Sequence, residues 1–135
     1  MGLSALQKLR FEFDIRRRYV AIRTRGQTVA TDVLWARSFL ARGRGLLGTH
    51  GLTPGRDGCL LDPCRRIHCH GMKYPIDTIH LSREFYIVGL ERVDIGKTGA
   101  RFKGSRCVLE LASGEIERCG LKAGDRLSID PSRVG

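Results

Sequence analysis

The feature that most constrains the fold is a series of short segments in which hydrophobic residues recur at every second position. Alternate side chains of a β-strand lie on the same face of a sheet, so this period predicts half-buried strands. We expect strands over residues 9–15, 19–24, 28–35, 78–81, 85–93, 107–111 and 126–130, and residues 59–61 form a further short hydrophobic run. Short, regularly spaced strands separated by turn residues are typical of a mainly β sandwich or barrel.

Three local signals refine the expected sheet. Gly26 lies between the second and third segments and can adopt the positive φ of a hairpin turn. Pro75 disfavours a central strand over residues 71–77, because proline has no N–H to donate. Residues 86–88 are hydrophobic on both faces, which predicts a central position for the strand over residues 85–93.

One or two short helices are expected beside the strands. Residues 38–47 could form one that Ser38 caps, although two glycines weaken it. Residues 113–119 suit a second helix, with Ser113 as its N-cap and Gly120 just after its C-terminus. The expected fold is therefore a compact, mainly β single domain, sandwich-like or barrel-like, with one or two short helices.

The length of the chain and its cysteines limit the class of protein. A chain of 135 residues corresponds to one domain. No hydrophobic run reaches the ~20 residues that a membrane-spanning helix needs. The first residues lack the hydrophobic segment of a signal peptide, which predicts a cytoplasmic protein. Five cysteines are an odd number, which argues against a closed disulfide framework.

Charge is the strongest signal in the composition. The chain has 24 Lys and Arg against 14 Asp and Glu, a net charge of +10. Residues 1–67 carry 13 basic and five acidic side chains, whereas residues 68–135 carry 11 and nine. A basic N-terminal half would attract nucleic acid, an anionic membrane surface or an acidic protein. A solvated basic surface without any partner explains the same charge.

The candidate polyanion-binding residues lie in that basic half. They are Arg16, Arg17, Arg18, Arg23 and Arg25, with Arg42 and Arg44 as further cations. Phosphate neutralisation needs only positive charge, whereas binding of single strands also uses exposed aromatic side chains. Tyr19 and Phe39 are the aromatic candidates, and the sequence contains no known RNA- or DNA-binding motif.

A second cluster of reactive side chains lies between residues 59 and 77. Zinc is bound by thiolate and imidazole groups, so Cys64, His68 and His70 are candidate metal ligands, although their spacing matches no known ligand motif. Alternatively, Cys64 could be a nucleophile, with His68 as its base and Asp77 as the group that orients the histidine.

The same residues also have a structural interpretation. Cysteine is among the most buried residue types, and buried polar side chains are normally hydrogen-bonded. Asp77 follows Pro75 and can accept backbone N–H groups that fix a turn. We therefore expect no cofactor, and we favour a structural role over catalysis for this cluster.

Several blocks of the sequence resemble a known family. The segment over residues 63–77 holds Pro63, Cys64, Ile67, His68, Met72, Pro75, Ile76 and Asp77 in a characteristic order. A block over residues 44–48 precedes it, and blocks over residues 108–111 and 120–125 follow. In these blocks the chain resembles the bacterial family known as domain of unknown function 192, over about residues 19–130.

The resemblance implies a single β-rich domain over residues 19–130. Residues 1–18 would then be a basic N-terminal extension and residues 131–135 a short tail. The predicted functional cluster consists of Cys64, His68, Met72, Pro75 and Asp77. The resemblance implies no activity, and because some members carry signal peptides, an association with the cell envelope stays open.

The function that we favour at this point is a small non-enzymatic module that binds a partner. One alternative is a metal-binding or Cys/His-dependent enzyme centred on Cys64, His68 and Asp77. The other is a nucleic-acid-binding module that uses the N-terminal arginines. The sequence does not identify the partner.

Overall fold

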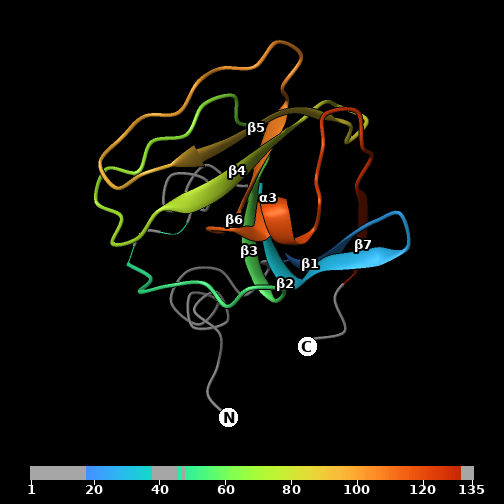
Figure 1. The fold of residues 1–135 in the computed structure, drawn as a ribbon, viewed down its shortest axis with the longest axis horizontal. Helices are drawn as coiled ribbons and strands as arrows, with labels where there is room; N and C mark the ends of the chain where they lie inside the picture. Colours follow the sequence, from blue (N-terminus) through green and yellow to red (C-terminus); the bar gives the residue numbers. More distant parts are fainter. Residues whose placement is uncertain (1–17, 38–45, 47, 132–135) are drawn as a thin grey trace.

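The computed structural model describes residues 18–37, 46 and 48–131. This part of the chain forms seven strands and one short helix (Figure 1). In chain order they are β1 (Arg18–Thr24), β2 (Gln27–Ala36), β3 (Asp57–Leu61), β4 (Ile76–Leu81), β5 (Ile87–Val93), β6 (Cys107–Ala112), α3 (Glu115–Arg118) and β7 (Ser128–Pro131). The prediction of a mainly β single domain with one or two short helices is confirmed.

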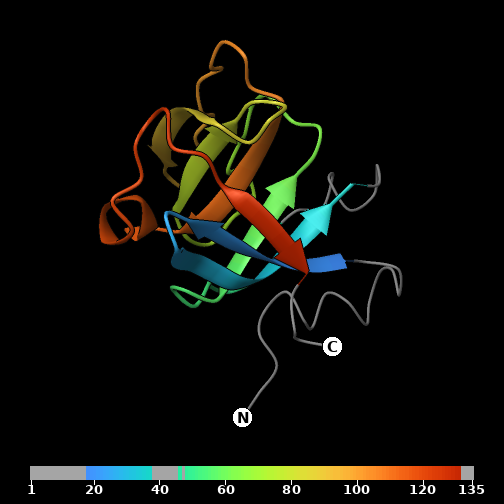
Figure 2. The same ribbon diagram turned by 90° about the vertical axis from the view of Figure 1, so that its right-hand side faces the viewer.

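The strands form one mixed sheet in the order β5-β4-β6-β3-β2-β1-β7. Neighbouring strands are antiparallel except β2 and β3, which are parallel. A parallel pair needs a crossover connection, which residues 37–56 supply. The sheet is not closed, and strands at the two ends of the order run in different directions because the sheet is twisted (Figure 2).

Two hydrophobic clusters lie on opposite faces of this sheet. The first contains Leu34, Leu61, Ile76 and Val108, on which Leu46, Ile67 and Met72 pack. The second contains Val20, Ile22, Leu60, Ile79, Ile87 and Leu111. Adjacent residues such as Leu60 and Leu61 belong to different clusters, as expected for a strand. Both clusters receive side chains from β1 and β5, so each of them extends across the sheet.

The β1–β2 hairpin forms where the sequence predicts it. Arg25 and Gly26 have φ angles of 49° and 74°. Two consecutive positive φ angles are those of a tight hairpin turn. The strand β4 begins two residues earlier than predicted, directly after Pro75, so this proline stays outside the hydrogen-bonded ladder.

The predicted central position of β5 is wrong, because β5 is an edge strand. The loop between β5 and β6 covers its hydrophobic side chains instead. A Cβ at Gly89 would lie only 2.1 Å from the Phe102 ring, and a Cβ at Gly104 would lie 3.9 Å from Val88. This loop takes the place of a further strand, a difference that a hydrophobic pattern alone does not reveal.

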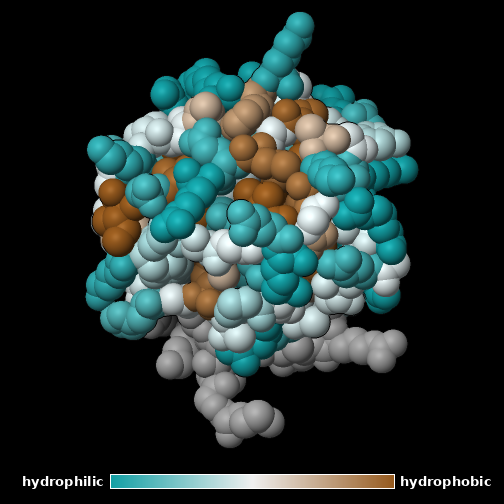
Figure 3. All heavy atoms as spheres, in the orientation of Figure 1, coloured by the Kyte–Doolittle hydropathy of each residue, from teal (hydrophilic) through white to brown (hydrophobic). Residues whose placement is uncertain are grey.

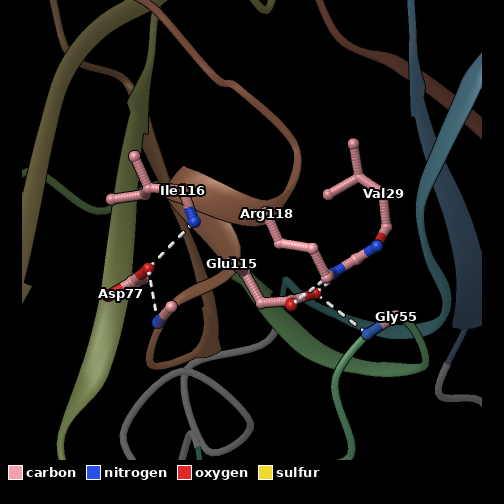
Figure 4. Close-up of polar contacts among 7 residues, drawn as sticks. Val29, Gly55, Asp77, Glu115, Ile116 and Arg118 are labelled. Carbon is pink, nitrogen blue, oxygen red and sulfur yellow. Dashed lines mark hydrogen bonds and ion pairs between the residues drawn. The ribbon is translucent and has the colours of Figure 1, made fainter.

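A polar cluster, which we call the α3 clamp, fixes the short helix to the sheet (Figure 4). It consists of the side chains of Asp77, Glu115 and Arg118 and the backbone N–H of Gly55. Asp77 Oδ2 accepts hydrogen bonds from the N–H groups of Gly114 and Ile116 at 3.0 and 2.9 Å. The prediction that Ser113 caps α3 is wrong, because the N-cap residue is Gly114 and a strand residue supplies the acceptor.

Glu115 is the buried centre of the α3 clamp. Its carboxylate accepts hydrogen bonds from Arg118 Nε and Nη2 at 2.6 and 2.7 Å, and from the N–H of Gly55 at 2.9 Å. Arg118 Nη2 also donates to the carbonyl of Val29 at 3.0 Å. Burial raises the pKa of Glu115, but the hydrogen bonds from Arg118 and Gly55 outweigh it and hold this pKa below its ordinary value.

Several predictions fall outside the described residues. They concern the strand over residues 9–15, the helix over residues 38–47, and Arg16, Arg17, Phe39, Arg42 and Arg44. Within the part of the chain that the structure describes, no helix has the length and hydrophobicity needed to cross a bilayer.

Candidate anion-binding site

The structure does not bring the predicted cluster of Cys64, His68, Met72, Pro75 and Asp77 together in one site. Cys64 and Met72 pack in the first hydrophobic cluster. Asp77 lies in β4, two residues before Ile79, and therefore faces the second cluster on the other side of the sheet. Pro75 is half-buried before β4, and the side chain of His68 is exposed.

The two candidate histidine ligands are neighbours on the surface. The rings of His68 and His70 lie 5.1 Å apart, and the backbone of His68 forms an isolated bridge with Thr98. Among residues 18–37, 46 and 48–131, no three His, Cys, Asp or Glu side chains are grouped as metal ligands would be.

The buried cysteines are poor nucleophiles in this fold. Burial raises the pKa of Cys69 to about 11 and that of Cys107 to about 12. Only a thiolate attacks an electrophile, so both thiols are protonated and unreactive at neutral pH. Cys64 is less buried, and its thiol donates to the carbonyl of Arg66 at 3.2 Å.

The predicted polyanion-binding arginines are spread over β1 and its turn. Arg18 begins β1, and Arg23 is exposed on the same strand. Arg25 Nη2 donates to the carbonyl of Gly120 at 3.0 Å and pairs with Asp125 at 3.6 Å. Arg25 therefore holds the hairpin to the segment before β7, which reduces its availability for a partner.

The structure concentrates positive charge elsewhere, in a hollow of about 420 Å³ that we call the basic pocket. Its cationic side chains are Arg65, Arg83, Arg101, Lys103 and Arg106, and Phe102 and Ser105 complete its wall. These cations come from three separate segments: the chain after β3, the β4–β5 turn and the β5–β6 loop. None of these five cations belongs to the predicted polyanion-binding set.

The β5–β6 loop is held in place by its own packing. The Phe102 ring lies directly over Gly89 of β5. Any side chain at position 89 would collide with this ring, so glycine is required there. The N–H of Arg106 donates to the carbonyl of Leu81 at 2.7 Å, and the N–H of Ser105 donates to the carbonyl of Phe102 at 3.1 Å. The backbone that carries Arg101, Lys103 and Arg106 is therefore fixed before any ligand arrives.

The β4–β5 turn presents Arg83 to the same pocket. The N–H of Ser82 donates to the carbonyl of Tyr86 at 2.9 Å, and the N–H of Phe85 donates to the carbonyl of Ser82 at 3.0 Å. Phe85 has a φ of 67°, an uncommon conformation for a residue with a bulky side chain. Such strain is retained where the surrounding structure enforces it, and the N–H of Leu127 holds the carbonyl of Phe85 at 2.9 Å.

An uncharged histidine lies behind the pocket wall. His80 is 1% exposed, and burial lowers its pKa to about 4, so the ring is neutral at physiological pH. Its Nδ1 lies 3.3 Å from Ser105 Oγ, and its ring centroid lies 4.5 Å from that of Phe102. His80 thus supports the wall by packing and hydrogen bonding, without adding to the positive charge.

Most of the positive charge in the basic pocket is not compensated. Arg106 Nε pairs with Asp62 Oδ1 at 3.7 Å. Within the described ranges, the side chains of the other four cations take part in no ion pair or hydrogen bond. A concave surface with one sign of charge concentrates counter-ions, so this pocket is suited to hold an anion.

A second hollow of about 380 Å³ adjoins the basic pocket. It is lined by Asp62, Arg83, Phe85, Arg106 and Cys107, so Arg83 and Arg106 border both hollows. Asp62 also accepts a hydrogen bond from Trp35 Nε1 at 3.2 Å. With one carboxylate and two arginines, the second hollow is much less basic than the first.

One local sequence signal could have indicated the basic pocket. Residues 101–106 contain three cations and a glycine in a loop between two strands. Such loops often carry binding residues on a rigid scaffold. The contributions of Arg65 and Arg83 could not be recognised in this way, because each is a single cation far away in the sequence.

Comparisons with known proteins place the fold. No curated protein matches the sequence of this chain. A candidate transcription regulator from Sinorhizobium meliloti 1021 has a similar structure, with a TM-score of 0.67 and 22% identity over 84% of this chain and 93% of that protein. A protein of unknown function from Novosphingobium aromaticivorans DSM 12444 has a TM-score of 0.69 and 17% identity, over 83% of this chain and 84% of that one.

These identities show a shared fold and no more. The family evidence is independent of them. Residues 20–129 match the family DUF192, which is described as "Uncharacterized ACR". This match spans most of the sequence and confirms the resemblance seen in its motifs, and the chain therefore belongs to the DUF192 family.

Proposed function

We propose that this chain is a non-enzymatic binding module that holds an anionic partner in the basic pocket. The observation that carries the proposal is the convergence of five cations on one hollow, four of them without a charged partner among the described residues. Like charges held close together repel one another, so an anion that enters the pocket relieves an unfavourable interaction.

The remaining surface carries hydrophobic as well as polar residues. The large hydrophobic residues that are clearly exposed within the described ranges are Tyr86 and Ile95. On the face shown in Figure 3, hydrophilic residues cover most of the rim, and hydrophobic residues form one larger area near the centre and smaller areas beside and below it. The proposal therefore depends on the charge of the basic pocket and not on a lack of hydrophobic surface.

The surroundings of Asp77 and of the buried cysteines favour a binding protein over an enzyme. Asp77 uses Oδ2 to hold two N–H groups of the α3 segment, so it is not placed to orient His68. The thiols of Cys69 and Cys107 are protonated at neutral pH. These side chains act in the fold, whereas four of the five pocket cations form no ion pair or hydrogen bond among the described residues.

Retention on a heparin column tests the proposal, because heparin is a dense polyanion. The double variant Arg83→Ala/Arg101→Ala should elute at clearly lower salt than the wild type, since it removes two pocket cations. The matched control Arg92→Ala/Lys122→Ala removes the same charge from exposed positions outside the pocket and should elute close to the wild type. Equal losses in both variants would show that bulk charge, and not the pocket, binds polyanions.

A third variant addresses the basic N-terminal residues. Arg16→Ala/Arg17→Ala should behave like the control if the basic pocket is the binding site. If this variant alone loses retention, the N-terminal arginines bind the polyanion and the proposal fails.

A further inference from the structure

We propose that the ligand is a small phosphorylated molecule whose phosphate lies in the basic pocket and whose organic part lies in the adjoining hollow. This inference rests on the proposed function and specifies its ligand class. Four features of the described residues support it. Several cations converge on one hollow, and the nearby aromatic rings already pack within the fold. A serine hydroxyl lies at the pocket wall, and the second hollow is less positively charged than the first.

The arrangement of the cations suits a compact oxyanion. Arg65, Arg83, Arg101, Lys103 and Arg106 surround one hollow, and are not arranged along a strand or a helix. Guanidinium groups bind phosphate through forked pairs of hydrogen bonds, which a dianionic phosphate with three terminal oxygens can accept from several sides. Volumes of about 420 and 380 Å³ are in the range of small-molecule sites.

Nucleic acid is a less suitable ligand because the nearby aromatic rings are already used. Single-stranded nucleic acid is bound largely by stacking its bases on exposed aromatic side chains. Phe102 packs over Gly89 and against His80, and the centroids of Trp35 and Phe85 lie 6.4 Å apart in an edge-to-face pair. Tyr86 is exposed, but the guanidinium of Arg126 lies over its ring.

Ser105 adds an uncharged hydrogen-bonding group to the pocket wall. Its hydroxyl lies 3.3 Å from Nδ1 of the neutral His80. When that nitrogen carries the proton and donates to Ser105 Oγ, the hydroxyl hydrogen is left to donate into the pocket. A phosphate oxygen can accept this hydrogen bond in addition to those from the arginines.

The second hollow suits the organic part of the ligand. Arg83 and Arg106 border both hollows, so one molecule can contact them from either side. Asp62 places a carboxylate in the second hollow, which disfavours further negative charge and can accept a hydrogen bond from a hydroxyl group. The ring of Phe85 supplies hydrophobic surface beside it.

Isothermal titration calorimetry at low ionic strength tests this inference with three probes: inorganic phosphate, glycerol 3-phosphate and a short oligothymidylate. We expect glycerol 3-phosphate to bind one molecule per chain and several-fold more tightly than inorganic phosphate, because only the ester reaches the second hollow. Arg83→Ala should weaken this binding by about tenfold, since it removes a charge-assisted contact. Arg92→Ala, which removes an exposed arginine of β5 outside both hollows, should leave the affinity unchanged.

The outcomes separate the ligand class from the proposed function. If oligothymidylate binds more tightly per phosphate and depends on Arg83, the basic pocket binds nucleic acid, and only the ligand class is wrong. If inorganic phosphate binds as tightly as glycerol 3-phosphate, the second hollow is not part of the site. If none of the three probes binds, and heparin retention does not depend on Arg83, the proposed function falls as well.

Discussion

The α3 clamp and the basic pocket use arginine in opposite ways. In the clamp, Arg118 makes two short hydrogen bonds to the buried carboxylate of Glu115 and a third to the carbonyl of Val29. In the pocket, Arg83 and Arg101 make no hydrogen bond or ion pair within the described ranges, although other cations lie close by. The same type of side chain stabilises the fold in one place and is left available in the other.

This difference indicates that the clamp contributes to the stability of the fold, whereas the pocket cations are available to bind a ligand. A buried carboxylate must be paired, because removing its partner leaves an uncompensated charge away from water. Exposed arginines cost the fold little when they are removed, and they gain a role only when a ligand supplies the negative charge. The comparison predicts large stability effects in the clamp and small ones in the pocket.

Loss of the Asp77 carboxylate should have the largest effect on stability. Asp77→Ala leaves the N–H groups of Gly114 and Ile116 without their acceptor, and we expect the free energy of unfolding to fall by about 3 kcal/mol. Urea denaturation measures this change. Asp77→Asn, which keeps an acceptor oxygen, should lose clearly less. Equal losses in the two variants would mean that the charge of Asp77, and not hydrogen bonding, fixes α3.

Glu110 is a buried carboxyl group that pairs with no cation among the described residues, and it sharpens the comparison with Glu115. No described residue forms a hydrogen bond with its Oε1, and burial raises its pKa to about 8. Below pH about 4.5 both the folded and the unfolded states hold the proton. Between pH about 4.5 and 8 only the unfolded state releases it, so this group lowers the free energy of unfolding as the pH rises.

Glu110→Gln removes this ionisation. The destabilisation of the wild type by this ionisation should be absent from the variant, so the difference between the two proteins should shift in favour of the variant by about 4 kcal/mol between pH 4 and pH 8. Denaturation curves of both proteins at several pH values provide the test. A difference between the two proteins that does not vary between pH 4 and 8 would contradict the raised pKa.

Arg118→Lys tests the geometry of the clamp at constant charge. Lysine keeps a cation near Glu115 but cannot form the forked pair of hydrogen bonds and also reach Val29, so we expect a loss of about 1 kcal/mol. Thermal unfolding at neutral pH is a suitable measurement. Arg92→Lys, in an exposed pair with Asp94, is the matched control and should be neutral.

Arg83→Ala should have the smallest effect on the protein without a ligand. The side chain of Arg83 makes no hydrogen bond or ion pair within the described ranges, so the free energy of unfolding should change by less than about 0.5 kcal/mol. The same denaturation experiment measures it. A loss as large as that of Arg118→Lys would show that the pocket cations help to hold the fold, and the contrast between the two regions would disappear.

Much of the fold could be predicted from the sequence, because strands and turns depend on local patterns. Hydrophobic patterns located most of the strands, although β3, β4 and β6 are buried at every position and are not the half-buried strands that alternation predicts. Gly26 marked the hairpin correctly. The order of the strands in the sheet could not be predicted in this way, since it depends on contacts between distant segments. The position of β5 is an example of what the pattern could not predict. The β5–β6 loop, with Phe102, covers this edge strand as a neighbouring strand would.

The candidate site was harder to predict than the fold. Cys64, His68 and Asp77 were predicted to form one site because they are reactive and close in sequence. The sheet nevertheless separates Asp77 from Cys64. The cations of the basic pocket span residues 65–106 and meet only after β4, β5 and β6 have paired. Asp77 was expected to accept backbone N–H groups in a nearby turn, and it accepts them from residues 37 and 39 positions away.

The pairing of β1 with β7 has a consequence for how the protein is made. Val20 of β1 lies opposite Pro131 of β7 in the sheet. During synthesis β1 leaves the ribosome before β7, so the outer edge of β1 stays uncovered until β7 has been made. A nascent chain therefore exposes a hydrogen-bonding edge that could pair with another molecule during synthesis. Once β7 docks, Pro131 lies in the new edge strand, and proline has no N–H with which to recruit a further strand.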